Sequence, residues 1–256
     1  MLKLIIAELL KKLITLLMLA TTTIINAQEI DYFADNPQWR MHMTFGGAMP
    51  CLELWDYVYW VNTYDTINGI VYARLFQTGT HEYQWMGPPP NQGCSGTYNF
   101  NVLEGLFRQE DQKIYQREGD TDIMIYDFDL EVGDTLPDSP ILYEDDIYVT
   151  AIDSILIGDQ YRKVFSLSTN VWGNSEQLIE GVGFVYGFLT GFPDWFYPEG
   201  LSCFWLNGEV CYENPNAWAP CDMYVGLKIT ILQIQNSVFI RILRPEISLL
   251  KLNLCH

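Results

Sequence analysis

The chain has 256 residues, and 32 acidic against 14 basic side chains give it a formal net charge of −18 at pH 7. This acidity argues against nucleic acid and anionic membrane surfaces as partners, and it leaves room for cation binding. The length suits one large β domain or two small ones, with a sizeable buried core.

The N-terminus has the features of a secretory signal. Lys11 and Lys12 precede the short apolar run 13–20, and Ala27 offers a small residue for cleavage. We therefore expect residues 1–27 to be a signal peptide and the mature protein to be secreted. An N-terminal anchoring helix is the alternative, and we predict no transmembrane segment in the mature chain.

The body reads as an antiparallel β domain. Short runs rich in Val, Ile, Tyr, Phe and Trp alternate with turn residues, and long helical periodicity is absent. Hairpin turns are predicted at Asn68-Gly69, Gly158-Asp159 and Asn207-Gly208, with a looser turn at Glu110-Asp111. We expect an all-β fold over 28–221, either a sandwich or an up-and-down barrel. The charge changes sign near residue 221, so 222–256 is expected to be a separate short tail.

An exported chain with six cysteines is expected to form disulfides. A two-residue turn at Asn207-Gly208 would place Cys203 opposite residue 212 and Cys211 opposite residue 204, so the two cysteines would point to opposite faces. These two cysteines should therefore not bond to each other. Six cysteines allow fifteen pairings, and among them we expect Cys203–Cys221 and Cys51–Cys94, with Cys211 free and buried.

The stretch 179–189, IEGVGFVYGFL, resembles a phosphate loop only at first sight. Its spacing is G-x-G-x-x-x-G, and Gly191 and Pro193 follow where a helix would have to begin. We predict a bent β segment, with Gly181 and Gly183 at positions where φ is positive or a side chain would clash.

No complete catalytic motif is present, and HEYQW at 81–85 is only half of a zinc-protease signature. An acidic cluster of four aspartates is a candidate Ca²⁺ site, with a solvated acidic face as the alternative. Exposed aromatic side chains beside proline-rich loops are candidates for ligand binding, whereas most tryptophans are expected in the core. The candidate residues are Asp120, Asp122, Asp127 and Asp129 for the metal, and Trp85 and Trp195 for the ligand.

The body contains five distinctive segments: NPQWR (36–40), KIYQREGDTDIMIYDFDLEVGDTL (113–136), VTAIDSILIGDQYRKVFSL (149–167), IEGVGFVYGFL (179–189) and LSCFWLNGEVCYENP (201–215). Together they resemble a group of uncharacterised secreted proteins from Bacteroidetes. In that group a β-rich body is followed by a type A sorting domain of the type IX secretion system. The resemblance therefore implies type IX machinery as a partner and a location at the outer-membrane surface or in the medium.

The tail both matches this group and departs from it. Residues 225–240 and 248–254 resemble parts of a sorting domain, but the usual Tyr-Pro-Asn-Pro segment is missing. The resemblance thus implies a degenerate sorting tail, and it transfers no catalytic residue.

Three functions fit these observations. The first is a non-enzymatic protein for binding or adhesion at the cell surface, with a glycan or a surface protein as partner. The second is a glycan-active hydrolase that uses two acidic residues in an aromatic-lined cleft. The third, a barrel that holds a small apolar ligand, requires a closed barrel with an interior cavity.

Overall fold

The structure of the chain is a computed structural model that describes residues 30–45, 50–87, 89–90, 93–142, 147–168, 176–190, 199–217, 219–221, 228–234 and 237–243. The chain divides into two units, residues 1–30 and residues 31–256, and the architecture below is that of the second unit. The expected signal peptide lies outside the described residues. Within these ranges, no helix has the length and apolar character needed to cross a membrane.

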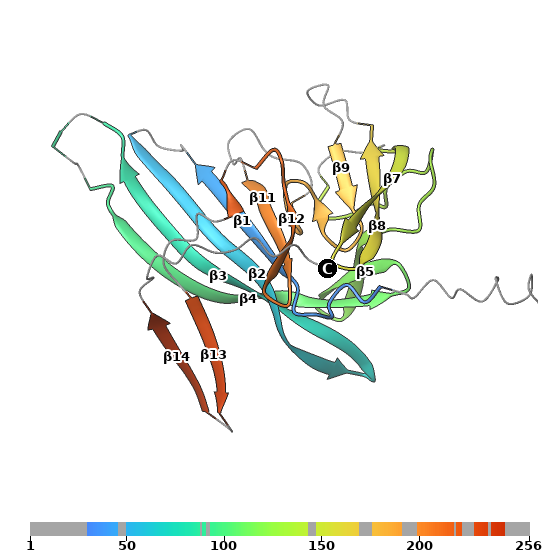
Figure 1. Cartoon of the computed structure of the whole chain (residues 1–256), viewed down its shortest axis with the longest axis horizontal. Coiled ribbons are helices and arrows are strands. Elements are labelled where there is room, and N and C mark those ends of the chain that lie inside the picture. The colour runs from blue at the N-terminus through green and yellow to red at the C-terminus, as the bar shows by residue number, and fades with distance from the viewer. Residues whose placement is uncertain are drawn as a thin grey trace, which may run out of the picture. The chain divides into compact units, whose positions relative to one another are not determined.

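Two antiparallel sheets form the body (Figure 1). The larger sheet has eight strands in the order β12-β11-β1-β2-β3-β4-β5-β6, and the smaller has four in the order β10-β9-β8-β7. The larger sheet consists of β1 (Gln38–Phe45), β2 (Cys51–Ile67), β3 (Ile70–Trp85), β4 (Gly96–Glu110), β5 (Lys113–Glu118), β6 (Thr121–Asp127), β11 (Glu199–Leu206) and β12 (Glu209–Glu213). The smaller consists of β7 (Val149–Ile157), β8 (Gln160–Leu167), β9 (Glu176–Ile179) and β10 (Gly183–Phe184).

The predicted all-β fold is confirmed, and of its two expected forms, sandwich and barrel, the structure is a sandwich. The two sheets stay separate and neither closes on itself, so the barrel alternative is wrong. The hypothesis of a barrel with an apolar ligand loses its structural basis for the same reason. In the tail, β13 (Lys228–Ile234) and β14 (Ser237–Leu243) pair with each other as a separate two-stranded sheet.

Turn chemistry explains most of the strand order. The turns at Asn68-Gly69, Gly158-Asp159 and Asn207-Gly208 lie where they were predicted. The two Asn-Gly turns have positive φ at both residues, as the favoured two-residue hairpins require.

The fourth turn lies one residue later than expected. Glu110 pairs with Lys113, so the turn consists of Asp111 and Gln112, and Asp111 takes the positive φ of 53°. Gly119 and Asp120 form a further two-residue turn, between β5 and β6, that the sequence reading did not identify. Aspartate tolerates the left-handed region better than most residues, which places Asp111 at the turn.

The core lies between the two sheets and is mainly aromatic. The indole of Trp39 on β1 is fully buried and stacks on Phe188, with 4.3 Å between ring centroids. Its N–H donates to the carbonyl of Val182 at 2.9 Å. The hydroxyl of Tyr126 on β6 likewise donates to the carbonyl of Phe188 at 2.6 Å. The segment after β9 thus joins the two sheets by ring packing and by hydrogen bonds that satisfy buried polar groups.

The glycines of that segment behave as predicted. Gly181 has a φ of +69° and Gly183 a φ of +98°, and both lie at the turn between β9 and β10. A Cβ on Gly181 would lie 2.6 Å from a ring carbon of Tyr32, and one on Gly183 would lie 2.9 Å from the hydroxyl oxygen of Tyr126. The phosphate-loop spacing therefore reflects a crowded turn at the sheet junction.

The residues that follow the expected signal are part of this core. Tyr32 and Phe33 are buried, and the Tyr32 hydroxyl donates to Glu180 at 2.8 Å. The hydroxyl of Tyr64 on β2 donates to the carbonyl of Phe33 at 2.9 Å. Cleavage after Ala27 would keep these contacts in the mature protein.

Candidate functional site

The larger sheet has an inner face, which carries Trp39 and packs on the smaller sheet, and an outer face opposite to it. Side chains alternate between the faces along each strand. Trp39, Met41 and Met43 on β1 lie opposite Tyr59, Tyr57 and Trp55 on β2, so these six side chains share the inner face. Trp55 in turn lies opposite His81 on β3, and His81 lies opposite Tyr98 on β4.

Five rings therefore gather on the inner face across three neighbouring strands. We call this set the ring face: Trp55, His81, Tyr83, Tyr98 and Phe100. Tyr83 and Tyr98 meet edge to face at 6.0 Å, and Trp55 lies 5.6 Å from Phe100. Such geometries add about 0.5–1.5 kcal/mol per pair beyond area burial, so the rings support one another's positions.

His81 is fixed at the centre of the ring face. Its imidazole stacks on Trp55 with 3.6 Å between ring centroids, and its Nε2 lies 2.9 Å from the carboxylate of Glu53. The His81 side chain is 11% exposed and that of Glu53 is 26% exposed. His81 is thus a satisfied polar group between a ring and a carboxylate, and HEYQW is not the start of a metal site in this geometry.

The periphery of the ring face is open to solvent. Tyr98 is 58% exposed, whereas Trp55, Tyr83 and Phe100 are partly exposed. Tyr57 next to them is buried, and its ring centroid lies 6.3 Å from that of Phe100. The arrangement offers aromatic surface on a firm base, with one carboxylate at its side.

A β-bulge brings these rings to one face. The pairing of β2 with β3 shifts by one residue between Val61 and Thr63, so Asn62 has no partner. Without this shift, Trp55 would lie opposite Glu82, and His81 and Tyr83 would point to the outer face. The sequence signal that was missed is the period-2 spacing of rings at 81, 83 and 85, which predicts a common face but not its partner strand.

Gly79 allows β2 and β3 to approach closely beside the ring face. A Cβ on Gly79 would lie 2.3 Å from the carbonyl oxygen of Asp56 and 2.4 Å from the Cβ of Tyr57. Real side chains do not make such contacts, so only glycine fits opposite Tyr57 at this point of the sheet.

The two tryptophans expected to bind ligand have different outcomes. Trp85 is the last residue of β3, lies opposite Cys51 and is partly exposed. A Cβ on Gly87 would lie 2.7 Å from its indole, so the loop after β3 folds onto the ring. Trp195 lies outside the described residues.

The four aspartates expected to bind Ca²⁺ do not gather at one point. Asp120 is in the turn before β6, and Asp129 follows the end of β6. Asp122 and Asp127 lie near opposite ends of that strand, about 17 Å apart at the usual rise per residue. No group of three or more His, Cys, Asp or Glu side chains suited to a metal occurs in the described ranges.

Two of these aspartates already serve cations of the chain itself. Asp122 accepts hydrogen bonds from the Tyr72 hydroxyl and from the guanidinium of Arg108, and its side chain is 15% exposed. Asp127 forms an ion pair with Lys113 at 2.8 Å. Asp122 thus links β6 to β4 across the intervening β5, and Asp127 links β6 to β5, at positions that were expected to bind a metal.

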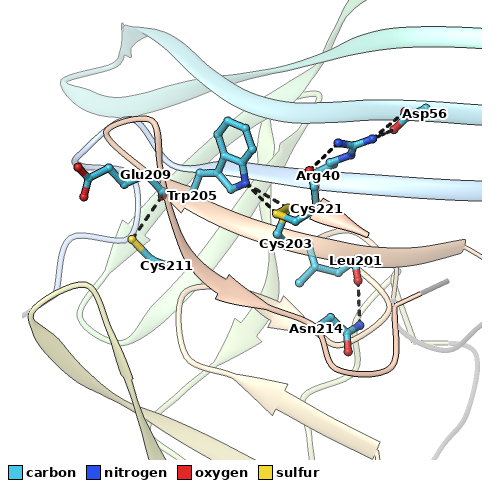
Figure 2. Close-up of a disulfide and its surroundings, with 9 residues drawn as sticks. All are labelled: Arg40, Asp56, Leu201, Cys203, Trp205, Glu209, Cys211, Asn214 and Cys221. Carbon is cyan, nitrogen blue, oxygen red and sulfur yellow. Dashed lines mark hydrogen bonds and ion pairs between the residues drawn. A yellow bond between two sulfur atoms is a disulfide. The ribbon is translucent and has the colours of Figure 1, made fainter. Parts of the chain in front are cut away.

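Both expected disulfides are present: Cys51 pairs with Cys94, and Cys203 pairs with Cys221. Figure 2 shows the second, on the outer face beside Trp205, whose indole N–H lies 3.1 Å from one sulfur and 3.4 Å from the other. Arg40 is 2% exposed and donates to the carbonyl of Cys221 at 2.8 Å and to Asp56. The disulfide and Arg40 together fix Cys221 to β11 and β1.

The expectation for Cys211 is wrong. The pairing of β11 with β12 shifts by one residue between Phe204 and Trp205, so that Phe204 lies opposite Tyr212 and Cys203 opposite Glu213. Cys211 is the extra residue of this bulge, is partly exposed and is disulfide-bonded. No cysteine in the described part of the chain is free.

Comparisons of the chain with family models, with curated proteins and with solved structures found no match.

Proposed function

We propose that this chain is an exported binding protein that holds glycans on the ring face. The observation that carries the proposal is Tyr98, which is 58% exposed although it belongs to a cluster whose inner members are packed and hydrogen-bonded. Large exposed rings on a rigid sheet are costly to leave in water and offer a preformed surface for a ligand.

The chemistry of the ring face suits a sugar. A sugar ring presents an apolar face of C–H groups and an edge of hydroxyl groups. The C–H face packs on aromatic rings such as Tyr83 and Tyr98, and hydroxyl groups donate to a carboxylate such as that of Glu53. Because Glu53 already bonds His81 at 2.9 Å, its carboxylate is held in place before a ligand binds.

Export is the second part of the proposal. Two disulfides, Cys51–Cys94 and Cys203–Cys221, support a location in an oxidising compartment. Together with the signal-like N-terminus and the resemblance of the tail to a sorting domain, they support passage through the type IX machinery to the outer-membrane surface or the medium. Secretion of the full chain by a host with and without that machinery tests this part.

Binding is tested with purified residues 28–256 on a glycan array, followed by titration of each hit. We expect Tyr98→Ala to weaken binding about tenfold, which corresponds to a loss of about 1.4 kcal/mol from the exposed ring contact. Tyr161→Ala is the matched control, because Tyr161 is 73% exposed but lies on β8 in the other sheet.

Three results would decide against this proposal. No glycan binds, or Tyr161→Ala weakens binding as much as Tyr98→Ala does, or the bound glycan is cleaved. Cleavage that depends on acidic residues would favour the alternative of a glycan-active hydrolase.

A further inference from the structure

The smaller sheet ends in an edge strand, β7, and among the described strands only β8 pairs with it. At the start of β7 the backbone of Val149 bonds to Gly133 and Asp134, and beyond this point the side away from β8 carries no described strand. The two ends of β7 are buried, because Val149 and Ile157 have no exposed surface. Between them the strand is exposed, with Ile152 at 38% and Leu156 at 49%. An exposed edge strand with apolar side chains is a template for pairing with another strand.

The hydrogen-bonding groups on the outer side of β7 can be assigned from its hairpin. The two-residue turn at Gly158-Asp159 makes Ile157 and Gln160 a hydrogen-bonded pair. Because backbone groups alternate along an antiparallel strand, those of Ile152, Ser154 and Leu156 point away from β8. In the described ranges, no backbone hydrogen bond from another segment reaches these three residues.

One backbone N–H on this side of β7 already donates a hydrogen bond. The N–H of Ser154 donates to the carboxylate of its neighbour Asp153 at 2.7 Å, at an exposed position. A backbone carbonyl oxygen of an added strand would accept from the same N–H. Since Asp153 is itself exposed, an incoming strand can replace it without opening the core.

We propose that β7 pairs with β7 of a second copy of this chain, antiparallel and with Ser154 opposite Ser154. A two-fold axis that joins two such strands always places one residue opposite its own copy. A register centred on Asp153 would place two carboxylates opposite each other, which destabilises a sheet. The register centred on Ser154 places Ile152 opposite Leu156 on both sides of the axis, and each Asp153 opposite Ile155.

The sequence of the strand favours a second copy as the partner. Val149–Ile157 contains no Lys and no Pro, the residues that commonly block edge pairing, and Asp153 is its only charged residue. The edge strand β6 differs, because the carbonyl of Ile125 accepts the hydroxyl of Ser139. The net charge of −18 opposes association, so pairing is expected at physiological salt, where charges beyond about 8 Å are screened.

The test uses the whole mature chain, residues 28–256, in sedimentation velocity at about 0.15 M salt. We expect a dimer that grows with concentration. Ser154→Lys should lower the association constant about tenfold or more, because it sets two like charges opposite each other across the axis. Thr66→Lys is the matched control, since Thr66 is exposed near the end of β2 and adds the same charge in the other sheet.

Cross-linking tests the register. Opposite residues of antiparallel strands lie about 4.5–5.5 Å apart between Cα atoms, which is within disulfide range, so Ser154→Cys should give a covalent dimer on oxidation. Ile152→Cys is the control, because its copy would lie about 13 Å away along the strand. A monomer at every concentration overturns the proposal, as does equal cross-linking of the two variants or a dimer that Ser154→Lys leaves unchanged. A monomer whose Ser154 amide exchanges slowly with solvent also overturns it, because another segment then covers this edge.

Discussion

The indole of Trp55 lies on the imidazole of His81 with their planes inclined by only 15°. The same imidazole bonds Glu53, so one side chain supports both the ring face and its carboxylate. We expect His81→Ala to lower the free energy of unfolding by about 2 kcal/mol, through loss of the stack and of a charge-assisted hydrogen bond. Glu53→Gln keeps the stack and an acceptor, and it should cost about 1 kcal/mol. Urea unfolding measures both, and equal costs would show that the stack contributes nothing.

The indole of Trp205 reports on a disulfide. Its N–H lies within 3.4 Å of both sulfurs of Cys203–Cys221, and nearby disulfides quench indole fluorescence. We expect reduction to raise tryptophan emission in the native protein and expect the rise to shrink in Trp205→Phe. An unchanged rise in that variant would place the quenched tryptophan elsewhere.

Local chemistry explains what the sequence could predict. An Asn-Gly pair adopts positive φ at little cost, so the turns at residues 68–69 and 207–208 follow from two residues each. Gly181 and Gly183 likewise predict a bend, although the side chains that crowd it, those of Tyr32 and Tyr126, come from distant parts of the chain. The antiparallel all-β fold follows from many such short-range signals.

The ring face could not be predicted because it depends on one unpaired residue far from it. The bulge at Asn62 changes the partner of Trp55 from Glu82 to His81. A bulge has no strong sequence signature, yet a shift of one residue moves every later side chain to the other face. A second shift of one residue, between Phe204 and Trp205, makes Cys211 a bulge residue, and this too has no signal in the sequence. Composition likewise does not reveal that Asp122 bonds Arg108, two strands away in the same sheet.

Gly183 should not tolerate a side chain. Its φ is +98°, and a Cβ would lie 3.0 Å from the Cα of Phe188 and 2.9 Å from the hydroxyl oxygen of Tyr126. We expect Gly183→Ala to cost at least about 2 kcal/mol of unfolding free energy. Gly200→Ala is the matched control on β11, where a Cβ would meet no atom within 4 Å, and it should be close to neutral. Similar costs for the two variants would contradict the account of the bend.

Asp122 should matter for stability more than for metal binding. Its removal leaves Arg108 and Arg117, which are 15% and 13% exposed, without their common carboxylate. We expect Asp122→Asn to cost about 2 kcal/mol, because each partly buried guanidinium keeps only its more exposed partner, Glu110 for Arg108 and Asp120 for Arg117. Asp120→Asn changes a fully exposed carboxylate of the same predicted cluster and should stay within about 0.5 kcal/mol. A Ca²⁺-induced rise in unfolding temperature that Asp122→Asn abolishes would instead make Asp122 a metal ligand.

Glu176 should make stability depend on pH. The residue is 6% exposed, and burial raises the pKa of its carboxyl group above the ordinary value of 4.5, while the hydrogen bond from the Tyr186 hydroxyl at 2.7 Å opposes the rise. A raised pKa means that the folded state binds the proton more tightly than the unfolded state. The stability from this group is therefore complete below pH 4.5 and is lost as the pH rises toward the folded-state pKa.

Two variants separate this effect from other acidic groups. Glu176→Gln cannot ionise and can still accept from Tyr186, so its stability relative to the wild type should increase as the pH rises from 4 to 7. Tyr186→Phe removes the hydrogen bond that lowers the pKa, so its stability should fall more steeply than that of the wild type over the same range. Chemical unfolding at several pH values measures both trends. Parallel curves for Glu176→Gln and the wild type would mean that Glu176 releases its proton as readily in the folded chain as in the unfolded one.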